Sequence, residues 1–121
     1  MREAVIVSTA RTPIGRAGRG AFNDTDGQVL AGHAIQHAVS RAGLEGAEVE
    51  DVVLGNAIQK GTTGGNVARQ ALLRAGLPTS VPGMTIDRMC SSGLMGIASA
   101  AKEIIVDGFE ITVGGGVESV S

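Results

Sequence analysis

The sequence predicts an α/β fold with a mostly parallel sheet, and three features of the chain lead to this prediction. Short β-branched apolar runs alternate with segments whose apolar residues recur at helical spacing, in the order β-α-β-α-β-α-β. Such alternation is typical of parallel strands joined by helices that pack on the sheet. Glycine is abundant, at 19 of 121 residues, which favours close strand–helix junctions. Aromatic residues make up only 2% of the chain, so we expect an aliphatic core.

The first half of the chain predicts two strands and the helix between them. The compact β-branched run at 4–9 predicts a buried strand. The segment 11–27 is rich in glycine and predicts a long loop. Apolar residues at helical spacing then predict a helix over 28–42, which Gly43 ends. A second apolar run predicts a strand at 49–57.

The second half continues the alternation. It predicts, in order, a helix at 66–75, a strand at 83–87, a helix from Ser91 or Ser92 to about Val106, and a strand at 109–113. Asn66 is a good amino-terminal cap for the first of these helices. The glycine run Gly114–Gly116 follows the last strand and is interpreted as a tight turn.

The helix that begins near Ser92 has an unusual composition. It carries no charge between Met89 and Ala101, and its apolar residues lie all around it. A helix of this kind is typical of a protein interior, so we expect it to be buried between two layers. Four strands alone would leave sheet edges and one sheet face poorly covered. We therefore expect residues 1–121 to form one incomplete part of a larger protein.

Charge and composition disfavour several classes of function. The net charge of −2 provides no broad basic field for nucleic acid or anionic lipid. No apolar stretch is judged to reach the roughly 18 residues that span a bilayer, so no membrane partner is expected. The chain begins without the features of a signal peptide, and its one cysteine cannot form an internal disulfide. These features predict a cytoplasmic protein.

The one cysteine, Cys90, is the strongest candidate for chemistry. It lies between a predicted strand and a predicted helix, where free backbone N–H groups and the positive end of the helix dipole collect. A thiol there is expected to ionise readily, and the same amides can hold the oxyanion that forms when it attacks a carbonyl. Arg88 favours ionisation and Asp87 opposes it. The alternative is a silent, buried thiol.

Other candidate sites are weaker. His33 and His37 have the spacing of a two-histidine metal site, but no further ligand lies nearby in sequence, so no metal is expected. The glycine-rich segments lack the complete fingerprints of phosphate or dinucleotide loops, which disfavours a nucleotide-binding domain. Glu118 follows the last strand, and adjacent strand ends can bring it towards Cys90 in a supporting role.

Five segments together resemble the amino-terminal part of the thiolase family, the acetyl-CoA C-acyltransferases. They are STARTPIGRAGRGAF at 8–22, VEDVVLGNAIQKG at 49–61, NVARQALLRAGLP at 66–78, DRMCSSGL at 87–94 and GGGVESVS at 114–121. The resemblance implies a layered fold with buried helices between two sheets. It also implies that residues 1–121 are an incomplete thiolase amino-terminal domain, without the loop domain and the later half.

The resemblance also implies roles for single residues. Cys90 matches the acyl-accepting cysteine, and its backbone N–H matches one oxyanion donor. Ser91, Ser92 and Gly93 match the turn into the buried helix. Glu118 matches the acid of the closing family motif, for which a supporting role is inferred. Many thiolases carry Asn where this chain has Asp87, so the effect of this acid on the thiol stays open.

The reaction implied is acyl transfer between acyl-CoA and CoA through a cysteine thioester, either thiolysis of a 3-ketoacyl-CoA or Claisen condensation. Coenzyme A is then a substrate, and no cofactor is expected. The expected partners are acyl-CoA, CoA and further copies of the chain in a dimer or tetramer. The family's second cysteine and its histidine are missing here, so we expect these residues alone to be inactive. A ketoacyl-synthase-like condensing enzyme and a non-catalytic fragment with a silent thiol are the alternatives.

Overall fold

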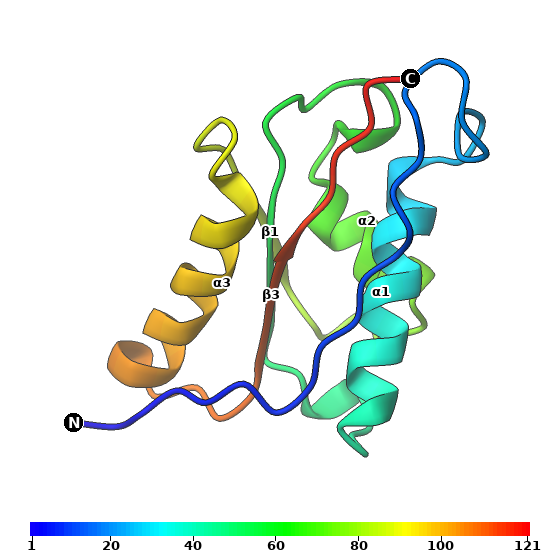
Figure 1. Cartoon of the computed structure of the whole chain (residues 1–121). Coiled ribbons are helices and arrows are strands. Elements are labelled where there is room, and N and C mark those ends of the chain that lie inside the picture. The colour runs from blue at the N-terminus through cyan, green and yellow to red at the C-terminus, as the bar shows by residue number, and fades with distance from the viewer.

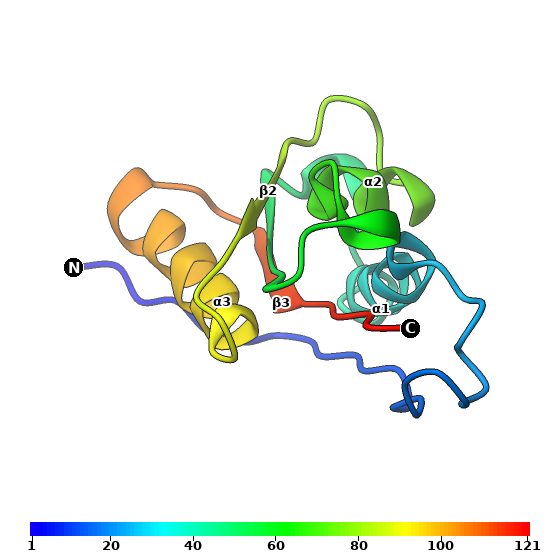
Figure 2. The same cartoon turned by 90° about the horizontal axis from the view of Figure 1, so that it is seen from above.

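The sheet of this protein has three parallel strands in the order β2-β1-β3. The strands are β1 (Asp51–Gly55), β2 (Gly83–Ile86) and β3 (Thr112–Gly116). The computed structural model describes residues 1–121. Helices α1 (Gly27–Arg41) and α2 (Val67–Arg74) cover one face of the sheet, and α3 (Ser92–Lys102) covers the other (Figures 1 and 2). Short 3-10 turns at Gly46–Glu48 and Gly61–Thr63 and a π-helical turn at Glu103–Asp107 complete the elements.

The main core lies between the sheet and the layer of α1 and α2. Because side chains alternate along a strand, Val52 and Leu54 of β1 face this layer. They pack with Ile35 of α1 and Leu72 of α2, and all four side chains are buried. Asn66 caps α2 as predicted, since its side chain accepts from the Arg69 N–H. The predicted α/β class and these two helices are confirmed.

On its other face, the sheet is approached very closely by α3, and glycine makes this possible. A Cβ atom added to Gly55 would lie 2.0 Å from the carbonyl carbon and oxygen of Ser92. One added to Gly96 of α3 would lie 2.4 Å from the carbonyl oxygen of Gly115. Real Cβ atoms do not come this close to backbone. The glycines on both elements therefore fix the separation between α3 and the sheet.

Within residues 1–121, α3 is covered by the sheet on one face and open on the other, so the second layer expected over this helix does not come from these residues. Its buried residues Ser92, Gly96 and Ala100 all face the sheet, whereas Leu94 is 71% exposed and Ile97 is 42% exposed. No layer of residues 1–121 lies beyond α3, and this is why its outer apolar side chains are uncovered (Figure 2).

The helical stretch Met89–Asp107 meets the length and composition of a membrane span, with 19 residues and a mean hydropathy of 1.3. This corrects the judgement that no apolar stretch is long enough. These two criteria do not separate a membrane helix from a core helix of a globular protein, and this helix packs along the sheet.

The predicted first strand does not form. Residues 4–9 run as an extended segment outside the sheet, and Val5, Ile6 and Val7 are 70 to 77% exposed (Figure 1). At one end of the segment, the Arg41 side chain donates to the Thr9 carbonyl. Just before its other end, Arg2 forms an ion pair with Glu110. β-Branched residues favour extended backbone, but a strand also needs a neighbouring edge for its hydrogen bonds, and no strand of the sheet pairs with this segment.

The last strand also differs from the prediction, since it spans Thr112–Gly116 rather than 109–113. The run Gly114–Gly116 is therefore part of β3 and not a tight turn. These glycines pair with β1 on one side and lie under α3. A Cβ on Gly114 would approach the Gly96 carbonyl oxygen to 2.8 Å, so glycine serves close packing here.

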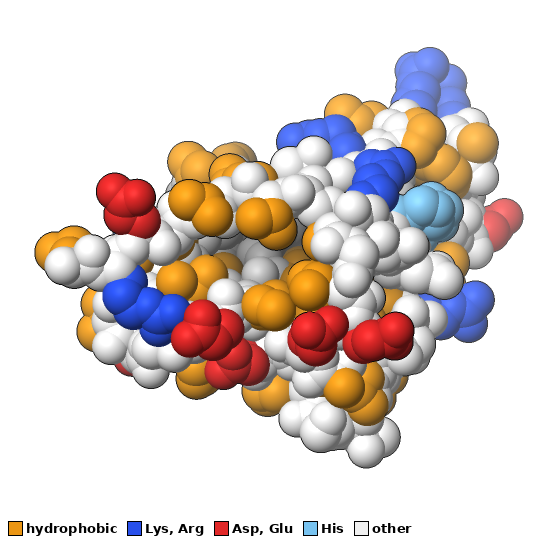
Figure 3. Space-filling view, turned by 90° about the horizontal axis from the view of Figure 1, so that it is seen from below, with side chains coloured by type: hydrophobic (Ala, Val, Ile, Leu, Met, Phe, Trp, Pro, Cys, Tyr) orange, Lys and Arg blue, Asp and Glu red, His pale blue; other side chains and the backbone are white.

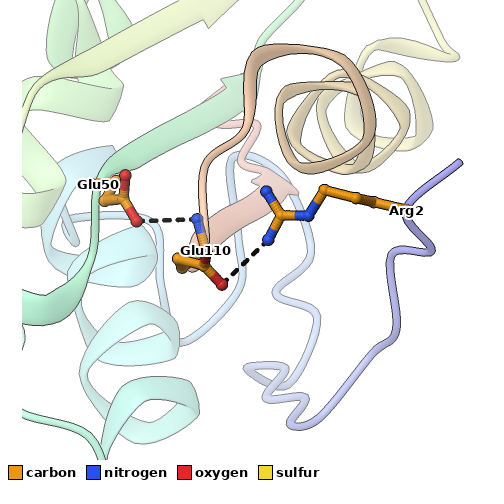
Figure 4. A network of polar contacts seen from close by, with 3 residues as sticks. All are labelled: Arg2, Glu50 and Glu110. Carbon is orange, nitrogen blue, oxygen red and sulfur yellow. Dashed lines mark hydrogen bonds and ion pairs between the residues drawn. The ribbon is translucent and has the colours of Figure 1, made fainter.

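Acidic side chains gather at the amino ends of the strands. Glu50 accepts the Glu110 N–H at 2.8 Å, and Arg2 pairs with the Glu110 carboxylate at 3.0 Å (Figure 4). Figure 3 shows this end of the molecule, with acidic side chains beside a hollow that is rimmed by hydrophobic ones. Burial and the neighbouring acids Asp51 and Asp107 raise the pKa of Glu103 to about 7.

The close approach of α3 predicts a large effect for one added methyl group. We expect Gly55→Ala to destabilise the protein by about 3 kcal/mol, because backbone atoms of Ser92 must move. Gly115→Ala is the matched control, since its Cβ would meet only the Leu54 side chain at 3.6 Å. Urea unfolding measures both changes. Equal, small losses of stability in both variants would mean that the Ser92 backbone does not pack against Gly55.

The raised pKa of Glu103 predicts a pH-dependent stability. Between pH 4.5 and about 7 the folded state holds a proton that the unfolded state has lost, so stability falls as pH rises through this window. We expect Glu103→Gln to have a Tm above that of the wild type at pH values beyond this window and no advantage below it. Thermal scans across pH test this, with exposed Glu3→Gln as the control. An advantage that is independent of pH would contradict the prediction.

Candidate active site

Cys90 lies in a sharp turn between the carboxyl end of β2 and the start of α3, and it is exposed. The turn depends on Met89, whose φ of 47° lies in the left-handed region that side chains other than glycine seldom adopt. Such a conformation costs on the order of 1–3 kcal/mol and persists only where neighbouring contacts hold it. The predicted strand–turn–helix position of Cys90 is therefore confirmed.

Asp87 and Ser92 hold this turn from within. The Asp87 carboxylate accepts the Met89 N–H at 2.8 Å and lies 3.4 Å from the Ser92 hydroxyl. The buried Ser92 hydroxyl accepts the Arg88 N–H at 2.7 Å and donates to the Met89 carbonyl at 2.6 Å. Asp87 thus lies within the turn of Cys90 and makes specific bonds there.

Neither Ser91 nor Ser92 caps α3 with its side chain. Ser91 occupies the capping position, but its hydroxyl donates backwards to the Arg88 carbonyl at 2.8 Å. Neither serine hydroxyl accepts an N–H of the first helical turn. Both side chains are used to close the turn that precedes α3.

Backbone amides at the start of α3 are left free. The N–H groups of Cys90, Gly93 and Leu94 donate to no acceptor in the protein. Unpaired amides and the helix dipole make this end of a helix favourable for negative charge. The exposed sulfur and these donors share one turn of backbone, so an oxyanion formed beside the sulfur has donors within the same segment.

Glu118 lies at the same edge of the sheet but does not contact the Cys90 turn. It follows β3, whereas Cys90 follows β2, and β1 lies between them. Two strand spacings separate the outer strands by about 10 Å. The Glu118 carboxylate instead accepts the backbone N–H groups of Ala57 and Ile58, at 3.0 and 2.8 Å. Its observed contacts are with the loop after β1.

Asn56 lies at the same edge of the sheet, and the sequence alone did not single it out. It is fully buried directly after β1, and its side-chain amide donates to Glu118 at 3.0 Å and to the Val117 carbonyl at 2.6 Å. One signal was available, because a polar residue directly after a buried parallel strand lies at the edge where sites form. Its neighbours in space come from a segment about 60 residues away, which no local pattern reveals.

The remaining candidates lie elsewhere. His33 and His37 are neighbours on α1, with ring centroids 4.2 Å apart and ring planes tilted by 40°, and no third potential ligand joins them. Arg88 is exposed and makes no ion pair. A hollow of about 250 Å³ lies beyond the carboxyl ends of α1 and α2, lined by Val39, Leu44 and Leu77 among others, and it contains none of the site residues.

Comparison with known proteins identifies the family. The model of the thiolase amino-terminal domain matches residues 4–121. The chain belongs to the thiolase family. It is 40% identical to a 3-ketoacyl-CoA thiolase of Bacillus subtilis and 41% identical to an acetyl-CoA acetyltransferase of Cupriavidus necator, in both cases over its whole length. It also superposes on the crystal structure of Bacillus anthracis acetyl-CoA acetyltransferase with a TM-score of 0.89 at 44% identity, over 96% of this chain.

The same comparisons place this thiolase chain within longer relatives. It spans 31% and 30% of the two curated relatives and 29% of the crystallised chain. The resemblance seen in the sequence, including the amino-terminal location of the match, is therefore confirmed. The layered α/β class is confirmed as well, with three strands within residues 1–121.

The bonds of Asp87 predict which substitutions the Cys90 turn tolerates. Asp87→Asn retains an oxygen that can accept the Met89 N–H, so we expect stability within about 0.5 kcal/mol of the wild type. Asp87→Ala removes the acceptor and is expected to cost about 1 kcal/mol. Urea unfolding compares the two. If the Asn variant loses as much as the Ala variant, the charge of Asp87 and not its acceptor geometry holds the turn.

Proposed function

We propose that this chain is the nucleophile-bearing portion of a thiolase and that Cys90 accepts the acyl group. One observation carries the proposal: an exposed sulfur lies beside unpaired amides at the start of a helix. A buried, silent thiol would lack both access and donors. Family membership supports the same assignment, because Cys90 lies in the DRMCSSGL segment that resembles the family's cysteine motif.

The acylation step follows from these groups. The Cys90 thiol gives its proton to solvent water, and the sulfur attacks the carbonyl carbon of an acyl-CoA or the 3-keto carbon of a 3-ketoacyl-CoA. The carbonyl oxygen gains negative charge, which the N–H of Cys90 and neighbouring amides stabilise. Collapse of this intermediate breaks the carbon–sulfur bond to CoA, or the carbon–carbon bond of a 3-ketoacyl substrate. The leaving group takes up a proton from solvent, and an acyl thioester remains on Cys90.

The second step transfers the acyl group to CoA or to the carbanion of a second acyl-CoA. That step needs a base, and Cys90 is the only cysteine of this chain. We therefore expect residues 1–121 alone to accept an acyl group without ordinary turnover. Ser91, Ser92, Gly93 and Asp87 support the reaction by shaping the turn.

The substrates follow from the same proposal. Relatives are named as a 3-ketoacyl-CoA thiolase and an acetyl-CoA acetyltransferase, which supports acyl-CoA and CoA as the substrate class. Coenzyme A then enters as substrate, with no further cofactor. Such chemistry belongs to fatty acid metabolism, and a free reactive thiol fits the reducing conditions of the cytoplasm.

We also propose a homo-oligomer, a dimer or a tetramer. β2 forms an edge of the sheet, and Met84 on this strand is 42% exposed. An open strand edge can pair with a second copy. β2 leads directly into the Cys90 turn, so a contact at this edge would lie next to the proposed site.

The experiment that tests the function is acyl transfer to the complete polypeptide that contains this chain. After brief exposure to acetyl-CoA, we expect intact-mass and peptide analysis to place one acetyl group on Cys90. Cys90→Ala should lose the adduct and turnover, because no sulfur remains to attack. Ser40→Ala, at an exposed position on α1, is the control that should keep both. An adduct on another residue, or turnover by Cys90→Ala, would overturn the assignment.

A further inference from the structure

We propose that Asn56 is a positioning residue for Cys90, which it affects through the carboxyl ends of β1 and β3 without touching the substrate. This inference rests on the proposed function, because it concerns how the acyl-accepting turn is held. It gives a buried side chain outside the Cys90 turn a defined part in the reaction. The argument depends on its hydrogen bonds and on the packing next to them.

Asn56 connects all three strand ends. Its backbone N–H donates to the Ile86 carbonyl of β2 at 2.9 Å. Its side-chain Nδ2 donates to the Val117 carbonyl and to Glu118, directly after β3. The backbone bond is independent of the side chain, so the side chain specifically ties the end of β1 to the end of β3.

The carbonyl oxygen of the Asn56 side chain adds no hydrogen bond, so any stabilisation by this amide comes from Nδ2. The Oδ1 atom of Asn56 is buried and has no hydrogen-bond partner. A buried polar group without a partner costs about 1–3 kcal/mol, and an apolar side chain of similar shape would avoid this cost. An amide at this position is thus favourable only through the two bonds it donates.

The hydrogen bonds of the Asn56 side chain lie next to the glycines on which the start of α3 packs. Gly55 and Gly116, the last residues of β1 and β3, are paired in the sheet. Ser92 and Gly93 rest on these two glycines, since a Cβ on Gly55 would meet Ser92, and one on Gly116 would lie 2.7 Å from the Gly93 Cα. The positions of these two strand ends therefore determine how far the first turn of α3 lies from the sheet.

Glu118, which follows β3, makes further hydrogen bonds to the residues after β1. Its carboxylate accepts from the Asn56 side chain and from the N–H groups of Ala57 and Ile58. Without the Asn56 amide, Val117 still donates its N–H to the Gly55 carbonyl at 3.1 Å and Glu118 still accepts from Ala57 and Ile58, so the link between the ends of β1 and β3 is loosened and not broken. The amides of Cys90 and Gly93 would then shift relative to the oxyanion that they are proposed to hold.

The first test compares Asn56→Ala with Val39→Ala in the complete polypeptide. Val39 is buried in α1 on the other side of the sheet and is a control for loss of stability alone. We expect Asn56→Ala to slow acylation of Cys90 by acetyl-CoA about 100-fold, because small misplacements of reacting groups have effects of this size. The apparent KM should change by less than about threefold, since substrate contacts are retained. Val39→Ala should acylate at nearly the wild-type rate while folded.

The second test uses Asn56→Asp, which preserves the shape of the side chain. Its carboxylate would face the Glu118 carboxylate, and like charges at this distance favour uptake of one shared proton. At low pH this shared proton restores a hydrogen bond between the side chain at position 56 and Glu118. We expect the variant-to-wild-type ratio of acylation rates to fall about tenfold between about pH 6 and about pH 8. Ionisation of the thiol has the opposite pH trend and cancels in the ratio.

The outcomes separate the two proposals. If the wild type is not acylated on Cys90, the proposed function fails. If the wild type is acylated, but Asn56→Ala behaves like Val39→Ala at equal folded fraction, the positioning role fails. If Asn56→Ala does not fold, the pH ratio of Asn56→Asp decides, and a ratio that does not change with pH overturns the inference.

Discussion

The close contact between α3 and the sheet is the constraint on which the rest of this structure depends. Gly55 of β1 and Gly96 of α3 leave no room for side chains at the contact, so backbone packs almost directly on backbone. Backbone positions are defined far more rigidly by such contacts than by flexible side chains. The turn that carries Cys90 inherits this rigidity, because it begins α3. The Cys90 sulfur and its neighbouring amides are therefore held by the main chain of the sheet.

The two ends of the sheet have different chemistry. Acids gather at the amino ends of the strands, where desolvation and mutual repulsion raise the pKa of Glu103. At the carboxyl ends, polar side chains are paired with backbone amides, as Asp87 is with Met89 and Glu118 is with Ile58. Ligand sites of open parallel sheets form at the carboxyl ends. Anionic acyl-CoA is thus proposed to meet the end of the molecule where amides, and not clustered carboxylates, are unpaired.

Much of the site could be predicted from local sequence, and the reasons are physical. A β-branched run, a short turn and a charge-free small-residue helix place Cys90 at a helix start whatever surrounds them. Asp87 lies two residues from the N–H that it binds, so its contact is local. The partner of Glu118 was not predictable in this way. Its three bonds are made to the loop after β1, which is distant in sequence, and the expected approach to Cys90 is interrupted by β1 itself.

The sequence by itself determined the alternation of strands and helices, the turn at Cys90 and membership of the thiolase family. These properties are carried by periodicity, capping residues and motifs, which act over a few residues. Only the tertiary structure decided that Gly114–Gly116 form a strand under a helix, that residues 4–9 remain unpaired and that Asn56 joins three strand ends. Pairing and close packing depend on what lies alongside a segment, and spacing along the chain does not contain this information.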